Sequence, residues 1–341
     1  MHEARVLVVD DSAAMRALFS DILEQQRDVR VVGTAASADE ARGAIAELKP
    51  NVVTLDVEMP GMSGIDFLKE IMETKPMPVV MLSGLTQSGT EVSLKAYELG
   101  AVECFPKPLK ATPDQFAKTV GKLGKIVLAA ANSNLRSKPR VKAAVEAPPF
   151  KWNGHIAAFS ASMGGIDALS ILLSGWPQNC PPTVICLQAE QPLIETFIAR
   201  LDADCKCSVR ALKDGAQLVQ GVVHVTADQG SHAVLEAGTP PRLRLLPRDP
   251  VDGARPSANL LFGTFARAGI PAAAAVLSGL GEDGAKGLKM MRDAGADTFA
   301  QDPSSAMVAE APAASIAAGG AKSQLALEEL GAALLAACSQ D

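Results

Sequence analysis

The first part of the chain alternates apolar runs with amphipathic segments. Apolar runs cover residues 4–9, 29–35, 52–56, 78–84 and 102–105. Between the first two runs, Met15, Leu18, Phe19 and Ile22 recur at spacings of three and four, which is the period of a helix buried on one face. Similar helical segments are expected at 39–48 and 92–99. Strands that alternate with helices in this way predict a doubly wound parallel α/β sheet.

A second alternation of the same kind starts near residue 155. Strand-like runs lie at 155–162, 183–188, 272–279 and 298–302, with several short strands between 208 and 246. Helical segments are expected after Gly165, near 197–201, over 288–294 and from Leu325 onward. This half therefore predicts a second doubly wound α/β sheet with a hairpin-rich middle.

The two alternations are separated by a stretch without periodicity. Between about 131 and 154 the sequence is rich in proline, asparagine, serine and basic residues, as is typical of a linker. A length of 341 residues also favours two domains, at roughly 150 residues per domain. The expected organisation is a first domain at 1–128, a linker at 129–153 and a second domain at 154–341.

Composition excludes several classes of function. The formal net charge of −6 argues against a nucleic-acid binder, which needs a basic face. No run of 18 apolar residues and no signal-peptide pattern is present, so we expect no membrane insertion and a cytoplasmic protein. The six cysteines are then expected to be free thiols. Cys205 and Cys207 are close in sequence, but one C-x-C pair is not a zinc ligand set.

Polar side chains follow the apolar runs of the first domain. Asp10, Asp11 and Asp56 stand at two strand ends, and Ser83 and Lys107 stand at two others. Ligands of such sheets bind at the carboxyl ends of the strands, where three carboxylates favour Mg²⁺. With the cation bound, one carboxylate can attack a phosphoryl donor, while a lysine and a hydroxyl bind the new phosphoryl oxygens. The competing interpretation is that these aspartates only cap helices.

The first 125 or so residues resemble the receiver domain of two-component response regulators. The resemblance rests on VVDDS (8–12), LDVEMPGMSG (55–64), VVMLSG (79–84) and PKP (106–108). It implies a flavodoxin-like fold and a histidine kinase as phosphodonor. It assigns Asp56 as phosphoacceptor, Asp10, Asp11, Asp56 and the Glu58 backbone carbonyl as Mg²⁺ ligands, and Ser83 and Lys107 as switch residues. One departure is Cys104, which stands where that family usually has an aromatic residue.

Two polar residues of the second domain stand where strands turn into helices. Ser162 lies in SASMGG, where glycines let backbone and substrate approach and a helix N-terminus offers N–H groups to an oxyanion. Asp283 lies in GLGEDG, placed to orient an imidazole. The alternatives are a serine that caps its helix and an aspartate that shapes a turn.

Together with RPSANLLF (255–262) and FAQDPSSAMV (299–308), these motifs resemble the catalytic domain of chemotaxis protein-glutamate methylesterases. The resemblance covers about 154–338, and receiver-then-esterase is that family's domain order. It implies hydrolysis of glutamate methyl esters, and deamidation of glutamine, on the cytoplasmic helices of chemoreceptors. It also implies a Ser-His-Asp triad with Ser162 and Asp283 as two members.

The triad histidine is missing. Matching the strand VICLQAEQP to the family's V-I-x-x-Q-H-M-P motif puts Ala189 at the histidine position, whereas counting back from Phe197 gives Gln188. Neither residue can accept the Ser162 proton near neutral pH. Glu190 and His232 are the first candidates for a substitute base.

Three further positions depart from the family: Ala254, Asn259 and Leu280. Two functions therefore stay open. One is a phosphorylation-controlled esterase with weak or no activity. The other is a non-catalytic signalling module that acts as a phosphate sink or by binding a partner.

Overall fold

The computed structural model describes residues 2–83, 87–107, 113–135 and 150–340. The chain divides into two compact units, residues 1–137 and 138–341. The centre of the expected linker, 136–149, lies outside the described residues. Among the helices that the structure describes, none is both long and apolar enough to cross a membrane.

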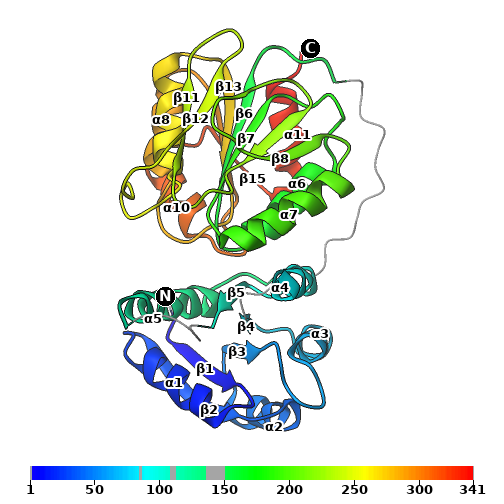
Figure 1. Cartoon of the computed structure of the whole chain (residues 1–341), viewed down its shortest axis with the longest axis vertical. Helices are drawn as coiled ribbons and strands as arrows, with labels where there is room; N and C mark the ends of the chain where they lie inside the picture. Colours follow the sequence, from blue (N-terminus) through cyan, green and yellow to red (C-terminus); the bar gives the residue numbers. More distant parts are fainter. Residues whose placement is uncertain (1, 84–86, 108–112, 136–149, 341) are drawn as a thin grey trace. The chain divides into compact units, whose positions relative to one another are not determined.

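The first unit is a five-stranded parallel sheet covered by five helices (Figure 1). Its strands lie in the order β2-β1-β3-β4-β5, and helices α1 and α5 pack against each other. The elements are β1 (Ala4–Val9), α1 (Ala13–Glu24), β2 (Val29–Ala35), α2 (Ala38–Leu48), β3 (Val52–Asp56), α3 (Gly64–Thr74), β4 (Val79–Ser83), α4 (Gln87–Leu99), β5 (Glu103–Pro106) and α5 (Pro113–Ala131).

Serine side chains fix where three of these helices begin. Ser12, Ser37 and Ser63 are the N-cap residues of α1, α2 and α3, and each accepts a backbone N–H of the first turn. At the start of α3, a Cβ on Gly64 would overlap the backbone oxygen of Asp56. Only glycine therefore lets α3 begin this close to the end of β3.

The second unit is built on a seven-stranded, all-parallel sheet in the order β15-β14-β13-β6-β7-β10-β8. An antiparallel three-stranded sheet, β11-β12-β9, lies beside it. The elements are β6 (Ile156–Ala161), α6 (Gly165–Ser174), β7 (Thr183–Leu187), α7 (Gln191–Asp204), β8 (Ser208–Ala211), β9 (Ala216–Gln217), β10 (Val222–Val225), β11 (His232–Glu236), β12 (Arg242–Leu246), α8 (Ala258–Ala268), β13 (Ala272–Val276), α9 (Ala285–Asp293), β14 (Asp297–Gln301), α10 (Glu310–Ala317), β15 (Ser323–Leu325) and α11 (Leu327–Ala337).

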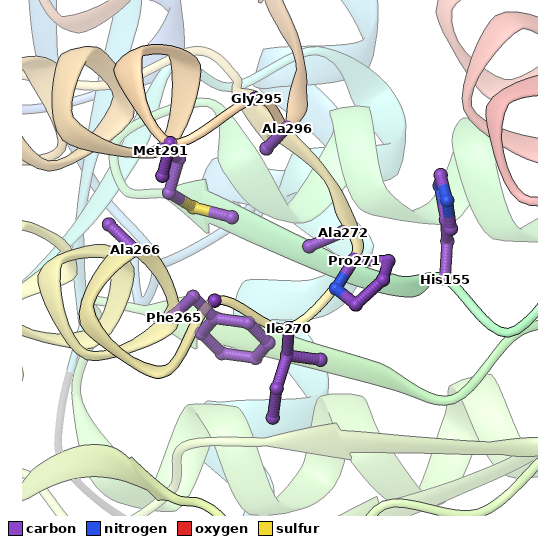
Figure 2. Close-up of a pocket in the computed structure, with 11 residues that line it drawn as sticks. His155, Phe265, Ala266, Ile270, Pro271, Ala272, Met291, Gly295 and Ala296 are labelled. Atoms are coloured by element: carbon purple, nitrogen blue, oxygen red, sulfur yellow. The ribbon is translucent and has the colours of Figure 1, made fainter.

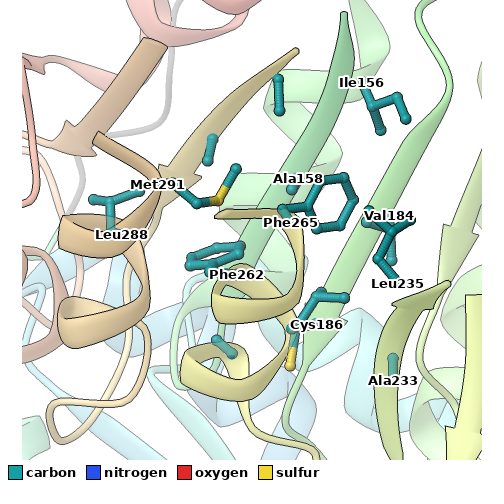
Figure 3. Close-up of a cluster of buried hydrophobic side chains, with 14 of the residues drawn as sticks. Ile156, Ala158, Val184, Cys186, Ala233, Leu235, Phe262, Phe265, Leu288 and Met291 are labelled. Atoms are coloured by element: carbon teal, nitrogen blue, oxygen red, sulfur yellow. The ribbon is translucent and has the colours of Figure 1, made fainter. Parts of the chain in front are cut away.

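Helices cover both faces of the large sheet. Helix α6 packs with α7 and α11, while α9 packs with α8 and α10, and Figure 1 shows the two groups on opposite sides. Figure 3 shows the core under α8 and α9, where Phe262, Phe265, Leu288 and Met291 lie against the alanine-rich strands. The small alanine side chains of β13 leave room for these large ones, because a close-packed core must fill its volume.

The predicted fold class, two doubly wound parallel α/β domains, is confirmed. The structure adds β15, which the hydrophobic pattern does not predict because its three residues include two exposed polar side chains. Of the short strands between 208 and 246, β8 and β10 join the parallel sheet, and the other three form the separate antiparallel one.

Candidate phosphoacceptor site and candidate hydrolase site

The carboxyl edge of the first sheet gathers the predicted acidic residues. Asp10 follows β1 and Asp56 ends β3, and these two strands are neighbours in the sheet. Ligand oxygens of Asp10, Asp11 and Asp56 all lie within 4.8 Å of one another. Asp10 and Asp56 are buried, and Asp11 is exposed. The alternative in which these aspartates only cap helices does not fit α1, whose cap is the hydroxyl of Ser12.

Lys107, which follows β5, reaches the same site. Its Nζ lies 2.9 Å from Asp10 Oδ2 and 2.7 Å from Asp56 Oδ2. Burial raises the pKa of Asp56, and the hydrogen bond from Lys107 opposes this effect. Burial acts to lower the pKa of Lys107, but hydrogen bonds to Asp56 and Asp10 outweigh it, so the pKa is raised. The site thus holds a buried carboxylate beside a fixed ammonium group.

The predicted switch residues lie on the neighbouring strands. Ser83 ends β4, and its Oγ lies 3.4 Å from Ser93 Oγ on α4. Cys104, at the position expected for an aromatic residue, is buried in β5, and its Sγ donates to the Ser93 carbonyl at 3.6 Å. Tyr97, the only tyrosine of the chain, lies on α4, and its hydroxyl oxygen accepts a hydrogen bond from the Cys104 backbone N–H. Both β4 and β5 therefore contact α4 through polar side chains at this edge.

Ser162 lies at the carboxyl end of β6 and does not cap a helix with its side chain. The N-cap of α6 is Gly164, with a positive φ of 73° and no side-chain cap hydrogen bond. Ser162 Oγ instead accepts the backbone N–H of Leu280 at 3.0 Å. A Cβ on Gly279 would lie 2.6 Å from Ser162 Oγ, so glycine is what allows the β13–α9 loop to approach this hydroxyl.

Asp283, in the same loop, accepts hydrogen bonds from four donors. They are Ser257 Oγ–H, Ala258 N–H, Asn259 N–H and Gln188 Nε2–H. Three of these donors belong to the first turn of α8 or its N-cap, where the helix dipole favours a negative charge. Asp283 is therefore more than a turn residue, because it joins the β13–α9 loop to α8.

The fourth donor, Gln188, comes from the end of β7. Its Nε2 lies 2.8 Å from Asp283 Oδ2 and 2.8 Å from the Pro256 carbonyl, so both amide hydrogens are used. The Gln188 backbone N–H donates to the carbonyl of Ala161, the residue directly before Ser162. Ala189, favoured by the motif match, is half-buried and carries no polar side-chain group. The side chain that contacts Asp283 is thus Gln188, the residue given by counting back from Phe197, and not Ala189.

None of the four histidines offers a base to Ser162. His232 is fully buried, accepts the Ser257 N–H at Nδ1 and bonds the Asp249 carbonyl through Nε2, so both ring nitrogens are occupied. His224 lies inside β10 and bonds the Gln217 carbonyl, and burial lowers its pKa.

The other two histidines lie elsewhere. His155 precedes β6, at the opposite end of the strand from Ser162, and His2 belongs to the first unit. Within the described part of the chain, Ser162 Oγ accepts a hydrogen bond from the Leu280 N–H, and no acceptor is in place for its own hydroxyl proton.

Asn259, one of the predicted departures, has a structural role. Its Oδ1 accepts the N–H groups of Gly284 and Gly287 at 3.1 Å and 2.9 Å, at the start of α9. An amide oxygen can accept these bonds as a carboxylate can, but without the charge.

A surface pocket of this unit lies at the far end of the strands, away from Ser162. Figure 2 shows Phe265, Ile270, Pro271 and Met291 around it, with His155 at its rim. Its lining comes from the end of α8, the start of β13 and the end of α9. The pocket therefore contains none of the predicted catalytic residues.

Comparisons with known proteins identify a family for each of the two units. Residues 6–119 match the response regulator receiver domain family, and residues 157–334 match the CheB methylesterase family. The chain is 43% identical over 338 residues to protein-glutamate methylesterase/protein-glutamine glutaminase 1 of Caulobacter vibrioides, with 98% of each chain covered. It is 41% identical over 340 residues to the protein-glutamate methylesterase/protein-glutamine glutaminase of Agrobacterium fabrum, with 97% of this chain and 96% of the relative covered.

Among solved structures, the CheB methylesterase catalytic domain of Thermotoga maritima covers 54% of this chain and 98% of its own length. The TM-score is 0.52 at 24% identity, which supports the fold of the second unit. The receiver motifs, the positions of Ser162 and Asp283, and the full-length matches lead to one conclusion. The chain belongs to the chemotaxis response regulators that join a receiver domain to a CheB methylesterase domain.

Proposed function

We propose that phosphorylation of Asp56 controls an effector domain that hydrolyses receptor methyl esters very slowly or not at all. The observation that supports this proposal is the Gln188 amide on Asp283, in a site where the described residues give Ser162 Oγ a hydrogen-bond donor and no acceptor. The phosphodonor would be a histidine kinase. The target would be the methylated cytoplasmic helices of a chemoreceptor. The names of the relatives give methyl esters of protein glutamate as the group that those proteins hydrolyse.

The receiver half has the groups that phosphoryl transfer needs. A cluster of carboxylate oxygens suits a hard divalent cation, and Asp10, Asp11, Asp56 and the Glu58 backbone carbonyl would hold Mg²⁺. The cation would neutralise charge on the incoming phosphoryl group. An Asp56 oxygen then attacks phosphorus as the bond to the donor nitrogen breaks, and the Lys107 ammonium stabilises the new acyl phosphate.

The effector half has a nucleophile and an orienting acid without the proton acceptor between them. Gln188 fills the space beside Asp283 with an amide whose two hydrogens are donated to Asp283 and Pro256. An amide does not titrate near neutral pH, so Gln188 cannot remove the Ser162 proton. The Leu280 N–H remains able to bind a carbonyl oxygen at this site.

Two assays test the two halves separately. Acetyl phosphate with Mg²⁺ should label the wild-type protein and not Asp56→Asn, whereas equal labelling of both would contradict the receiver assignment. Methanol release from methylated receptor should be near background in the phosphorylated protein. Robust release that Ser162→Ala abolishes would mean that another base serves, and Glu190→Gln would then identify or exclude Glu190.

A further inference from the structure

Glu310 brings a carboxylate to the loop that holds Ser162. Glu310 lies in the first turn of α10, and its Oε2 accepts the backbone N–H of Gly281 at 3.0 Å. The preceding N–H of this loop, that of Leu280, donates to Ser162 Oγ, also at 3.0 Å. Two consecutive N–H groups of the β13–α9 loop are therefore bonded to the predicted nucleophile and to an acidic side chain from another helix.

Backbone hydrogen bonds fix the start of α10 against the same loop. The Gly279 N–H donates to the Val308 carbonyl, and the Ala311 N–H donates to the Gly279 carbonyl, each at 3.0 Å. Val308 and Ala311 lie on either side of Glu310 in the sequence, and both contact the one glycine. The fold therefore sets the position of the Glu310 backbone beside the loop, and the side chain only has to reach Gly281.

The Glu310 carboxylate lies close enough to Ser162 for its charge to act there. Each of the two side-chain oxygens is 3.0 Å from its backbone nitrogen. Successive backbone nitrogens are joined by three bonds of about 1.5 Å or less, so Ser162 Oγ and Glu310 Oε2 are at most about 10 Å apart. This separation is no larger than the Debye length at about 0.1 M salt, within which charges are not fully screened.

Ester hydrolysis at this site would place a negative charge beside the same N–H groups. When the Ser162 oxygen bonds to the ester carbon, its proton passes to a base and the carbonyl electron pair becomes an oxyanion. The Leu280 N–H is placed to bind that oxygen, whereas the neighbouring Gly281 N–H is already bonded to Glu310. A fixed carboxylate here opposes the oxyanion, because like charges repel.

We propose that Glu310 is a second barrier to ester hydrolysis at this site, independent of the missing base. Its carboxylate disfavours a negatively charged intermediate at Ser162 and acts much less on the neutral ester. The inference deepens the proposed function and rests on it, since both take Ser162 as the nucleophile of a slow hydrolase. At a separation of about 10 Å, Coulomb's law gives a factor of about 2 at the dielectric constant of water and about 20 at an effective dielectric constant of about 20.

Methylboronic acid tests this charge effect without any turnover. Its boron accepts the Ser162 oxygen, the hydroxyl proton is released to the buffer, and the tetrahedral adduct carries one negative charge, as the intermediate does. The full chain is titrated in low salt at about pH 8, and the adduct is measured by boron NMR. We expect Glu310→Gln to bind the probe about 2–20-fold more tightly than the wild type, because its amide oxygen can still accept the Gly281 N–H while the charge is gone.

Two control variants and a salt series separate charge at this position from a structural effect. Glu310→Asp keeps the charge and should bind the probe as weakly as the wild type. Glu329→Gln removes the same charge from an exposed glutamate in the first turn of another helix, α11, and should also bind as the wild type does. Raising the salt to about 1 M should shrink the difference between the wild type and Glu310→Gln, because salt screens exposed charges.

The same change should act on catalysis once a base is present. In a Gln188→His background, Glu310→Gln should raise methanol release from methylated receptor by a similar factor, and an unchanged rate would overturn the proposal. So would equal probe affinity in the wild type and Glu310→Gln, including no adduct in either, or an adduct that survives Ser162→Ala. Failure of the proposed function would appear differently, as robust methanol release by the wild type that Ser162→Ala abolishes.

Discussion

Replacing Gln188 with histidine should convert the effector site into a working hydrolase. The Gln188 amide lies 2.8 Å from Asp283 Oδ2, so an imidazole there can donate Nδ1–H to the same carboxylate. Its other nitrogen can then face Ser162, because the Gln188 backbone bonds Ala161 on the neighbouring strand. In subtilisin, loss of the triad histidine lowers kcat by about 10⁶.

The expected gain for Gln188→His is smaller than that loss. A positioned general base typically contributes about 10²–10⁴ in rate, which corresponds to about 2.7–5.4 kcal/mol of transition-state stabilisation. The variant also loses the bond from Nε2 to Pro256, at about 1 kcal/mol of folding free energy. That cost lowers Tm by about 2–4 °C in a domain of this size and leaves the domain folded.

The assay is methanol release from methylated receptor across pH 5–9. A general base acts in its neutral form, so the rate should rise with pH through the imidazole pKa, which is ordinarily about 6.5, and then level off. Asp283 stabilises the charged imidazolium, so the midpoint should lie above that ordinary value. Ser162→Ala in the same background should abolish the gain.

Ala189→His is the matched control, because it introduces the same imidazole one residue away. It should stay inactive, since the side chain that contacts Asp283 belongs to residue 188. Activity in Ala189→His with none in a folded Gln188→His would refute this register. If both variants fold and stay inactive, the site lacks more than a base, and Ala254 and Leu280 are the next positions to change.

Three further predictions concern stability. Asp283→Ala should lower the free energy of unfolding of the second domain by about 3–5 kcal/mol in urea titrations, because four hydrogen-bond donors lose their acceptor. The control Glu282→Ala, at an exposed neighbouring residue, should change this free energy by less than about 0.5 kcal/mol. Gly64→Ala should destabilise the receiver by at least about 2 kcal/mol because its Cβ meets backbone, whereas Gly43→Ala, with open space around it in α2, should stabilise it by about 0.5–1 kcal/mol. Burial lowers the pKa of His224 in the folded state, so on acidification the unfolded chain takes up a proton first. The free energy of unfolding should therefore fall as the pH drops below about 6.5. His224→Gln should remove this part of the pH dependence.

The fold could be predicted because parallel sheets covered on both faces have a simple pattern. Strands buried on both sides appear as continuous apolar runs, and the residues that follow them gather at one edge. For that reason Asp10, Asp56 and Lys107 could be brought together from their positions alone, and the structure has them in contact. The three-residue strand β15 lacks such a pattern, and pairing among short strands depends on contacts distant in sequence.

The position beside Asp283 could not be settled from the sequence. The strand motif and the distance to Phe197 disagree by one residue, and adjacent residues at a strand end point in different directions. The hydrogen bonds of Gln188 show which of the two residues lies beside Asp283, and they cannot be deduced from the strand pattern.

Ser162 and Asp283, the two predicted triad members, do not by themselves argue for catalysis, because each has a place in the fold. Asp283 accepts the first N–H groups of α8, and Ser162 accepts a backbone N–H from the loop that carries Asp283. A glutamine at 188 fits this arrangement, since it supplies one N–H to Asp283 and another to Pro256, where alanine would leave both acceptors one donor short. Glutamine therefore preserves the hydrogen bonds that hold β7, α8 and the β13–α9 loop together while it removes the only property that catalysis needs there, the ability to take a proton. On this reasoning Gln188→Ala should cost about 1–3 kcal/mol of folding free energy and change methanol release little, whereas Gln188→His should cost about 1 kcal/mol and raise methanol release.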